Sequence, residues 1–260
     1  MAVKNTTKYY QDNQDILPSF ENAALKYAGD SVMSKWIKSE EARLSAMFST
    51  ECELHKKGIK LVAGVDEVGR GPMAGPVVAC AAVFSKFCFL PGLNDSKKLS
   101  ETEREFISSA IRKNALSYAL GIVDSEEIDR YNIHNASLLA MERAVEGLSV
   151  KPGFLLVDGK FRVDTLPIEQ LACIGGDAAV YSISAASIVA KVHRDNMMKE
   201  LDKTYPGYGL AEHKGYCTAD HMKALEKLGV TAIHRKSYKP VRDMLAKGKN
   251  HFEQIQVNLD

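Results

Sequence analysis

The chain has 260 residues, of which 45% are hydrophobic and 26% charged, and its formal net charge is +1. This composition is typical of a folded globular protein, and no apolar run approaches the roughly 20 residues of a membrane-spanning helix. The N-terminus is polar, and the five cysteines include no CxxC pair. These features argue against a membrane or secreted protein, so we expect a reduced, cytoplasmic protein. We also expect it to act as a monomer.

The sequence pattern changes near residue 59. Residues 1–58 predict two helices, over 21–27 and 31–55, because apolar side chains such as Trp36 recur there at near-helical spacing. From residue 59 onward, β-rich segments alternate with helical ones. We therefore predict a small helical N-terminal extension, residues 1–58, followed by a larger domain, residues 59–260, that ends in helices.

The elements predicted within residues 59–260 alternate along the chain. Strands are predicted at 59–65, 77–84, 118–123, 154–157 and 171–174. Helices are predicted at 100–114, from Ser125 onward, and at 184–205, 218–228 and 240–247. Ser100 and Glu103 form a capping box, and the first two strands have a hairpin-like relation. This order predicts an α/β fold, with a mixed β-sheet flanked by helices.

Acidic residues follow two of the predicted strands. Asp66 closes the first strand and Asp158 the fourth, each before a glycine-containing turn. Their carboxylates converge if the two strands are neighbours, since ligands meet α/β sheets at strand ends. Glu67 would face away in a regular strand, but a turn at Gly69 can return it to the same site. Asp177 is a fourth acid, just before the long helix.

Converging carboxylates repel one another unless a cation lies between them. Hard oxygen ligands favour Mg²⁺ or Mn²⁺, and two such ions can activate water and stabilise the leaving oxygen of a phosphodiester. The alternative interpretation is that each acid is an exposed turn residue, which is common for Asp. For Asp158 alone that interpretation is preferred. It is weaker for Asp66 and Glu67, which Gly-Arg-Gly-Pro follows.

Gly69, Arg70 and Gly71 indicate a substrate that carries phosphate. Glycines let the backbone approach a ligand closely, and arginine offers a planar fork for phosphate. The competing hypothesis is a dinucleotide-binding loop. It fails because the glycines at 69, 71 and 75 miss the G-x-G-x-x-G spacing by one, and because a strand follows rather than a helix.

Three further features have structural interpretations. His213, Cys217 and His221 share the spacing of zinc ligands on a helix, but Gly215 and Tyr216 interrupt any such helix, so a loop is preferred. Asp195 is interpreted as a buried helix acid paired with Arg194 or Lys191. The excess of Lys and Arg over Asp and Glu in residues 191–250 is suited to phosphate binding, although for charge alone solvated helix faces are the preferred interpretation.

Five motifs, in order over about residues 60–240, resemble those of type II ribonuclease H, or ribonuclease HII. They are DEVGRGP (66–72) with AGPVV (74–78), DSKKL (95–99), VDG (157–159), AASIVAKV (185–192) with RD (194–195), and YPGYG (205–209) with HKGY (213–216). The resemblance implies an RNase H-like catalytic domain over residues 59–260. It also implies endonucleolytic cleavage of the RNA strand of RNA–DNA hybrids, including single ribonucleotides embedded in duplex DNA, and hence a role in DNA repair. The cut would fall 5′ to the ribonucleotide and leave 3′-hydroxyl and 5′-phosphate ends.

The resemblance also implies roles for single residues. Asp66, Glu67 and Asp158 match catalytic ligands of Mg²⁺ or Mn²⁺ in a two-metal mechanism, and Asp177 matches the fourth catalytic acid. The substrate-binding matches are Gly69, Arg70 and Gly71, which would read the 2′-hydroxyl, Tyr216, which would pack on the following deoxyribose, and Lys97 and Lys98, which would contact phosphates.

Two other functions are weighed against this one. A nucleic-acid-binding module with vestigial acids would show substitutions in the acid set, and the acids are all present. A related type III enzyme or a DNA nuclease would share the fold. The Gly-Arg-Gly-Pro motif and the motif around Tyr216 favour type II.

Overall fold

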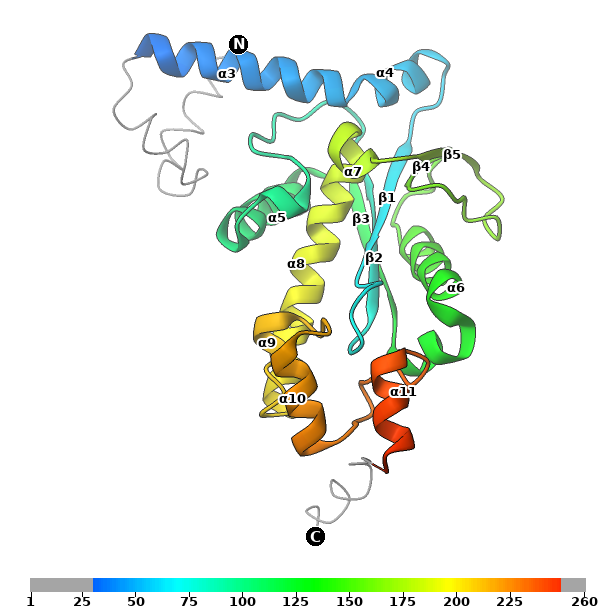
Figure 1. The fold of residues 1–260 in the computed structure, drawn as a ribbon. Helices are drawn as coiled ribbons and strands as arrows, with labels where there is room; N and C mark the ends of the chain where they lie inside the picture. The colour runs from blue at the N-terminus through cyan, green and yellow to red at the C-terminus, as the bar shows by residue number, and fades with distance from the viewer. Residues whose placement is uncertain (1–29, 249–260) are drawn as a thin grey trace.

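A computed structural model of the chain describes residues 30–248, which form a mixed sheet with helices on both faces (Figure 1). The five strands lie in the order β3-β2-β1-β4-β5. Their bounds are Val62–Val68 (β1), Val77–Val83 (β2), Ser117–Val123 (β3), Phe154–Asp158 (β4) and Glu169–Cys173 (β5). β2 pairs antiparallel with β1 and β3, whereas β4 pairs parallel with β1 and β5. The predicted α/β fold is confirmed.

The helices surround this sheet and extend beyond both of its ends. Their bounds are Asp30–Met47 (α3), Ser49–Lys56 (α4), Ser96–Lys98 (the 3-10 helix η1), Glu101–Asn114 (α5), Ser125–Glu146 (α6), Gly176–Ala179 (α7), Tyr181–Thr204 (α8), Leu210–His213 (α9), Ala219–Leu228 (α10) and Lys239–Ala246 (α11). None of the helices in the described part of the chain is long and apolar enough to cross a membrane. The helix predicted at 21–27 lies outside the described residues.

α8 and α6 cover opposite faces of the sheet. The small residues of β2 alternate between these faces, so that Val78 and Cys80 pack toward α8 while Val77 and Ala79 pack toward α6. The backbone of α8 touches the sheet at Gly64, where an added Cβ would lie 2.1 Å from the carbonyl carbon of Ser182. Glycine in β1 therefore lets the start of α8 lie directly against the strand that carries Asp66.

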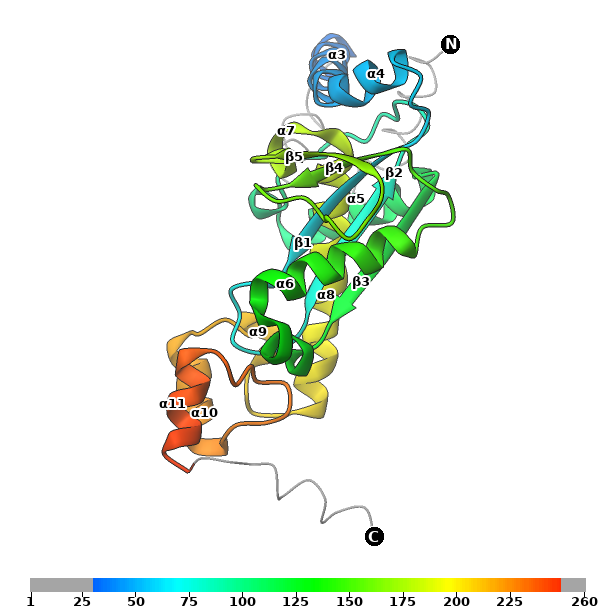
Figure 2. The same ribbon diagram turned by 90° about the vertical axis from the view of Figure 1, so that its right-hand side faces the viewer.

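α9, α10 and α11 lie together beyond one end of the sheet (Figure 2). They share an apolar cluster with the end of α8 and with the segment that follows β1, which contributes Met73 and Ala74. Ala74 also forms an isolated antiparallel bridge with His234. The segment between β1 and β2 is therefore held between the sheet and these helices.

The N-terminal helices run across the opposite end of the molecule (Figure 1). The prediction of one helix over 31–55 is wrong in one respect, because α3 ends at Met47 and α4 begins at Ser49. The chain bends at the buried Phe48, whose ring packs edge-on against Tyr181 with centroids 5.3 Å apart. The division of the chain at residue 59 stays a prediction.

Other element boundaries differ from the predictions by a few residues, and α8, for example, begins at Tyr181 rather than at residue 184. β1 does not close at Asp66 but continues through Glu67, because Asp66 and Glu67 stay paired with Cys80 and Ala79 of β2. The N-cap of α6 is Asp124 rather than Ser125, and Asp124 forms a capping box with Glu127. The hydroxyl of Ser125 instead donates to the carbonyl oxygen of Ala232, 2.9 Å away.

Candidate active site

Asp66 and Asp158 lie on adjacent parallel strands, which is the condition under which their carboxylates were expected to converge. The register pairs Val65 with Val157, which places the two following acids side by side. Asp66 is buried, with 5% of its surface exposed. Burial raises its pKa well above the usual value, and the negative charges of Glu67 and Asp158 raise it further. Burial likewise raises the pKa of Asp158.

Glu67 is next to Asp66 in the chain and forms an ion pair with Arg70 in the following turn. Its carboxylate lies 3.4 Å from Nη1 of Arg70. Burial raises the pKa of Glu67 to about 6, Arg70 opposes this rise, and Asp158 adds to it. Its backbone N–H donates to Oδ1 of Asp66 at 2.7 Å. Glu67 thus shares the electrostatic environment of the other two acids, even though β1 keeps its regular alternation.

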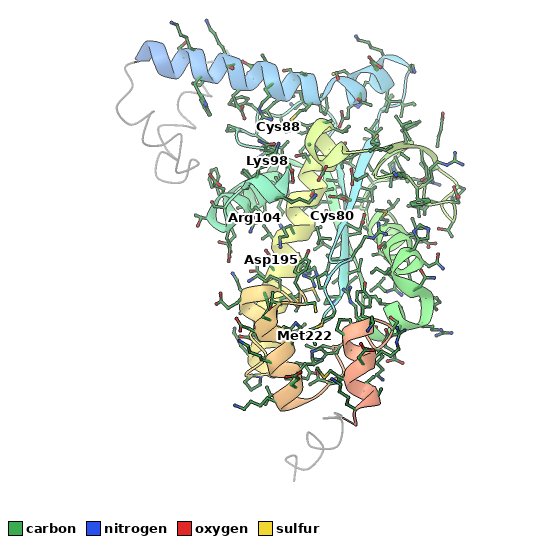
Figure 3. The ribbon with its side chains drawn as sticks, in the orientation of Figure 1. Cys80, Cys88, Lys98, Arg104, Asp195 and Met222 are labelled. Atoms are coloured by element: carbon green, nitrogen blue, oxygen red, sulfur yellow. The ribbon has the colours of Figure 1, made fainter. Side chains whose placement is uncertain are left out.

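Asp177 reaches the same place from the first turn of α7. Its backbone N–H donates to Oδ1 of Asp158 at 3.2 Å, and its carboxylate accepts a hydrogen bond of 3.0 Å from Nζ of Lys97. Lys97 lies on η1, next to Lys98, whose side chain is exposed on the same side of α8 as α5 (Figure 3). The fold therefore brings all four predicted acids and Lys97 together.

The four carboxylates lie near one another but do not converge on one position. Across residues 30–248, no three Asp, Glu, His or Cys side chains are arranged to hold one metal ion as they stand. At the zinc-like spacing, for which a loop was the preferred interpretation, His221 is buried with its Nε2 3.2 Å from Nε2 of His234, while Cys217 is exposed.

A cleft beside the acids is bordered by the loop that follows β1. Its lining is Glu67, Val68, Gly69, Arg70, Gly71, Ser96, Lys97, Lys191, Arg194 and Tyr216. Gly69 has φ +93°, and a Cβ there would lie 2.3 Å from Nε of Arg194. Glycine is required at this position both for the backbone conformation and for the space beside Arg194.

Two buried arginines hold this loop, residues 69–76, by its carbonyl groups. Arg235 donates to the carbonyl oxygens of Gly69 (2.6 Å), Arg70 (3.0 Å) and Gly75 (2.8 Å). Arg194 donates to those of Pro76 (2.9 Å), Ala74 (3.3 Å) and Lys214 (3.0 Å). Burial lowers the pKa of both guanidinium groups, and that of Arg194 falls to about 10. These hydrogen bonds to its carbonyl oxygens fix the backbone of residues 69–76.

Tyr216 faces the loop from the segment between α9 and α10. Its side chain is 48% exposed, and a Cβ on Gly71 would lie 3.3 Å from its Cε1. The two segments are joined where the N–H of Met73 donates to the carbonyl oxygen of Gly215 at 2.9 Å. The structure therefore places Tyr216 beside the predicted substrate residues Gly69, Arg70 and Gly71.

Asp195 has the structural position that was predicted. Lys191 is its partner, with Nζ 2.6 Å from Oδ1, and Arg104 lies 3.8 Å from Oδ2. Figure 3 shows Asp195 and Arg104 together between α8 and α5. The other residue predicted as a partner, Arg194, is instead committed to the carbonyl groups described above.

Several functional candidates escaped the sequence analysis. Ser187 opposes the rise in the pKa of Asp66, and its hydroxyl lies 3.2 Å from that of Ser96. Arg235 binds backbone carbonyl groups, and no pattern of side chains in the sequence predicts these bonds. The Arg-Asp motif and the position of Ser187 in the helix motif were visible, but their partners depend on tertiary contacts.

The comparisons with known proteins agree with this geometry. The family model for ribonuclease HII matches residues 63–241. Among solved structures, ribonuclease H2 from Pyrococcus horikoshii OT3 is 27% identical with a TM-score of 0.63, covering 73% of this chain and all (100%) of that one. An RNase HII from Archaeoglobus fulgidus, solved as a complex with PCNA, is 23% identical with a TM-score of 0.56, covering 69% and 95%. Bst-RNase HIII in complex with Mn²⁺ is 19% identical with a TM-score of 0.56, covering 75% and 72%.

A mixed five-stranded sheet with grouped carboxylates on its central strands defines an enzyme of the ribonuclease H type. The family match spans well over half of the sequence, and the chain belongs to the ribonuclease HII family. It is a ribonuclease H, a hydrolase that cuts phosphodiester bonds within a strand, and enzymes of this family act on RNA–DNA hybrids.

Proposed function

We propose that this ribonuclease H cuts on the 5′ side of a ribonucleotide, in hybrids and at single ribonucleotides within duplex DNA, leaving 3′-hydroxyl and 5′-phosphate ends. The observation that carries the proposal is the loop of Gly69, Arg70 and Gly71. It adjoins Glu67, is fixed by buried Arg235, and lines one cleft with Tyr216. The loop that would recognise the ribose thus follows the acidic residue Glu67 closely in the chain.

Asp66, Glu67 and Asp158 would hold Mg²⁺ or Mn²⁺, with Asp177 as the fourth acid. The fit is supported by the raised pKa values of the first three acids, because an added cation would offset both their burial and their repulsion. All four groups are hard oxygen donors, which these ions prefer. Two bound ions would activate the attacking water and stabilise the leaving oxygen. The Mn²⁺ complex of Bst-RNase HIII, which shares the fold, is a reason to test both ions.

The protein groups around the acids would bind and orient the substrate. The backbone of residues 69–71 would bond to the 2′-hydroxyl, which distinguishes RNA from DNA. The exposed ring of Tyr216 would pack on the deoxyribose that follows and disfavour an added hydroxyl there. Lys97 and Lys98 would contact phosphates, and such contacts hold register without reading sequence. In the free protein Lys97 is paired with Asp177.

The remaining proposals concern the whole chain. Residues 1–58 would be an extension of a catalytic domain formed by residues 59–260, and the enzyme would act as a monomer in the cytoplasm, in DNA repair. The free thiols of Cys52, Cys80 and Cys88 are typical of a reducing compartment. The buried Glu51 of α4, which accepts hydrogen bonds from Ser182 of α8, ties the extension to the catalytic domain.

The test compares three labelled duplexes: one with a lone ribonucleotide, one long RNA–DNA hybrid, and one of DNA alone. Each is incubated with Mg²⁺, Mn²⁺ or a chelator. We expect metal-dependent cleavage of the first two and none of the third. Cleavage of the long hybrid alone would indicate the substrate specificity of a type III enzyme. Binding of all three without cleavage would support the alternative of a binding module.

A further inference from the structure

A second cleft lies on the α6 side of the catalytic acids. Its lining is Glu67, Arg70, His134, Ser137, Leu138, Met141, Asp158, Gly159, Lys160 and Phe161. Glu67 and Arg70 line both this cleft and the one that contains Tyr216. Their ion pair of 3.4 Å therefore forms a ridge between the two clefts. Asp158 lines the second cleft and Glu67 lines both, so the predicted acids lie along both clefts.

The outer wall of the second cleft carries an exposed aromatic ring. Phe161, in the loop between β4 and β5, is 54% exposed. It is held edge-on against the His134 ring of α6, with centroids 4.6 Å apart. Figure 1 shows this loop and α6 on the same side of the sheet. The contact with His134 supports the ring from one edge and leaves much of its surface open.

Cations flank this ring in the sequence. Lys160 and Arg162 are both exposed, and Lys160 lines the cleft itself. Arg162 lies 3.5 Å from Asp164, so part of its charge is already compensated. An aromatic platform beside cations is the arrangement with which proteins bind bases and backbone phosphates without reading sequence.

We propose that the second cleft binds the deoxynucleotides on the 5′ side of the scissile phosphate, with Phe161 packing on a base or sugar and Lys160 contacting a phosphate. The direction rests on the proposed function. If the loop of residues 69–71 and Tyr216 bind the ribonucleotide and its 3′ neighbour, the nucleotides bound on the other side of the acids are those 5′ to the scissile phosphate. Recognition of the 2′-hydroxyl stays with the first cleft. Glu67 lines both clefts and Asp158 lines the second, which supplies affinity and register.

The experiment uses the full chain and duplexes with one ribonucleotide and a constant 3′ flank. The flank on the 5′ side is shortened stepwise from eight deoxynucleotides to one. Dissociation constants are measured by fluorescence anisotropy in the presence of chelator, and KM and kcat are measured with metal. For Phe161→Ala we expect the dissociation constant and KM on the long-flank duplex to rise about tenfold, with kcat little changed. The difference from the wild type should shrink as the flank is shortened, and Phe161→Trp should restore affinity.

Leu171→Ala is the matched control, because Leu171 is also an exposed apolar residue, 48% exposed, but lies on β5 outside the cleft. It should behave as the wild type on every duplex. Equal affinities of Phe161→Ala and wild type at all flank lengths would overturn the proposal, as would a loss that follows the 3′ flank instead. If the wild type binds but does not cut at the ribonucleotide, the proposed function fails, while a flank-dependent loss of binding in Phe161→Ala still supports the second cleft.

Discussion

Arg235 donates a hydrogen bond of 2.6 Å from Nη2 to the carbonyl oxygen of Gly69, although the two residues are 166 positions apart. The guanidinium is fully buried and binds backbone carbonyl oxygens. A buried cation that is satisfied in this way links the conformation of the substrate loop to the C-terminal helices.

Arg235→Lys should therefore damage both stability and substrate binding. Lysine cannot present the planar fork, so several buried carbonyl oxygens lose their donors, at a cost of about 1–3 kcal/mol each where they stay unsatisfied. We expect unfolding at lower urea concentration and a raised KM for a duplex with one ribonucleotide. Arg242→Lys, on the exposed face of α11, is the control and should change neither. An unchanged KM in Arg235→Lys would mean that the loop keeps its form without this arginine.

Asp66→Asn should abolish cleavage and leave the fold intact. The substitution removes a buried charge that Glu67 and Asp158 repel, so the free protein should lose no stability at neutral pH. We expect a loss of kcat of roughly a thousandfold or more, since residues of one catalytic unit fail together. Thermal unfolding checks the fold. Substantial cleavage by a folded Asp66→Asn protein would remove Asp66 from the catalytic set.

Two buried histidines should make stability depend on pH. Nδ1 of His234 accepts from the N–H of Thr231, so its Nε2–H faces Nε2 of His221 at 3.2 Å, and Nδ1–H of His221 donates to the carbonyl oxygen of Tyr216. Burial lowers the pKa of His221 to about 4 and that of His234 to about 3. Their folded pKa values thus lie below the unfolded value of about 6.5, so the unfolded state takes up protons first as pH falls.

The stabilising contribution of this pair is complete above pH ~6.5 and declines as pH falls toward ~4, by about 2 kcal/mol for each histidine at pH ~5. The raised pKa values of Asp66 and Glu67 act in the opposite direction over the same range. The measurement is therefore the difference in urea stability between wild type and His234→Gln, at pH 7.5 and at pH 5. This difference should shrink on acidification. A pH-independent difference would contradict neutral, buried histidines.

The extension should contribute to the stability of the catalytic domain. One carboxylate oxygen of Glu51 accepts from the N–H of Ser182 at 2.9 Å and from its hydroxyl at 2.6 Å, in the first turn of α8. Glu51→Ala should cost about 1–3 kcal/mol, because these donors lose a buried acceptor. Hydrogen exchange of the amides at the start of α8 should accelerate. Glu53→Ala, in the exposed face of the same short helix, serves as the control. Equal protection in both variants would show that α4 is dispensable for α8.

The parts predicted correctly from sequence are those that local pattern determines. Asp66 and Asp158 each follow an apolar run that forms a strand, as predicted, whereas the pairing of these two strands is a tertiary contact that local pattern does not determine. Ser100 and Glu103 form the predicted capping box. The break at Phe48 was not predictable, because no proline or glycine marks it and the packing of Phe48 against Tyr181 is a contact between distant segments.

The remaining features depend on contacts between distant segments. Arg194 stood in a recognised motif, yet its donors bind carbonyl oxygens, which every residue has and no pattern distinguishes. The second cleft requires α6 and the loop after β4 to meet, as His134 and Phe161 do. At the start of α6, Asp124 and Ser125 are both residue types that cap helices. The hydroxyl of Ser125 is bonded to the distant Ala232, and Asp124 is the N-cap.

The most direct test of the central claim is to map both ends of the cut in a DNA duplex with one ribonucleotide. Each strand is end-labelled in turn, and the products are resolved to one nucleotide after incubation with Mg²⁺ or Mn²⁺. We expect a single cut immediately 5′ to the ribonucleotide, with a 3′-hydroxyl that a polymerase extends and a 5′-phosphate on the ribonucleotide. A cut on its 3′ side, or an end that a polymerase cannot extend, would contradict the roles given to the loop of residues 69–71 and to the four acids.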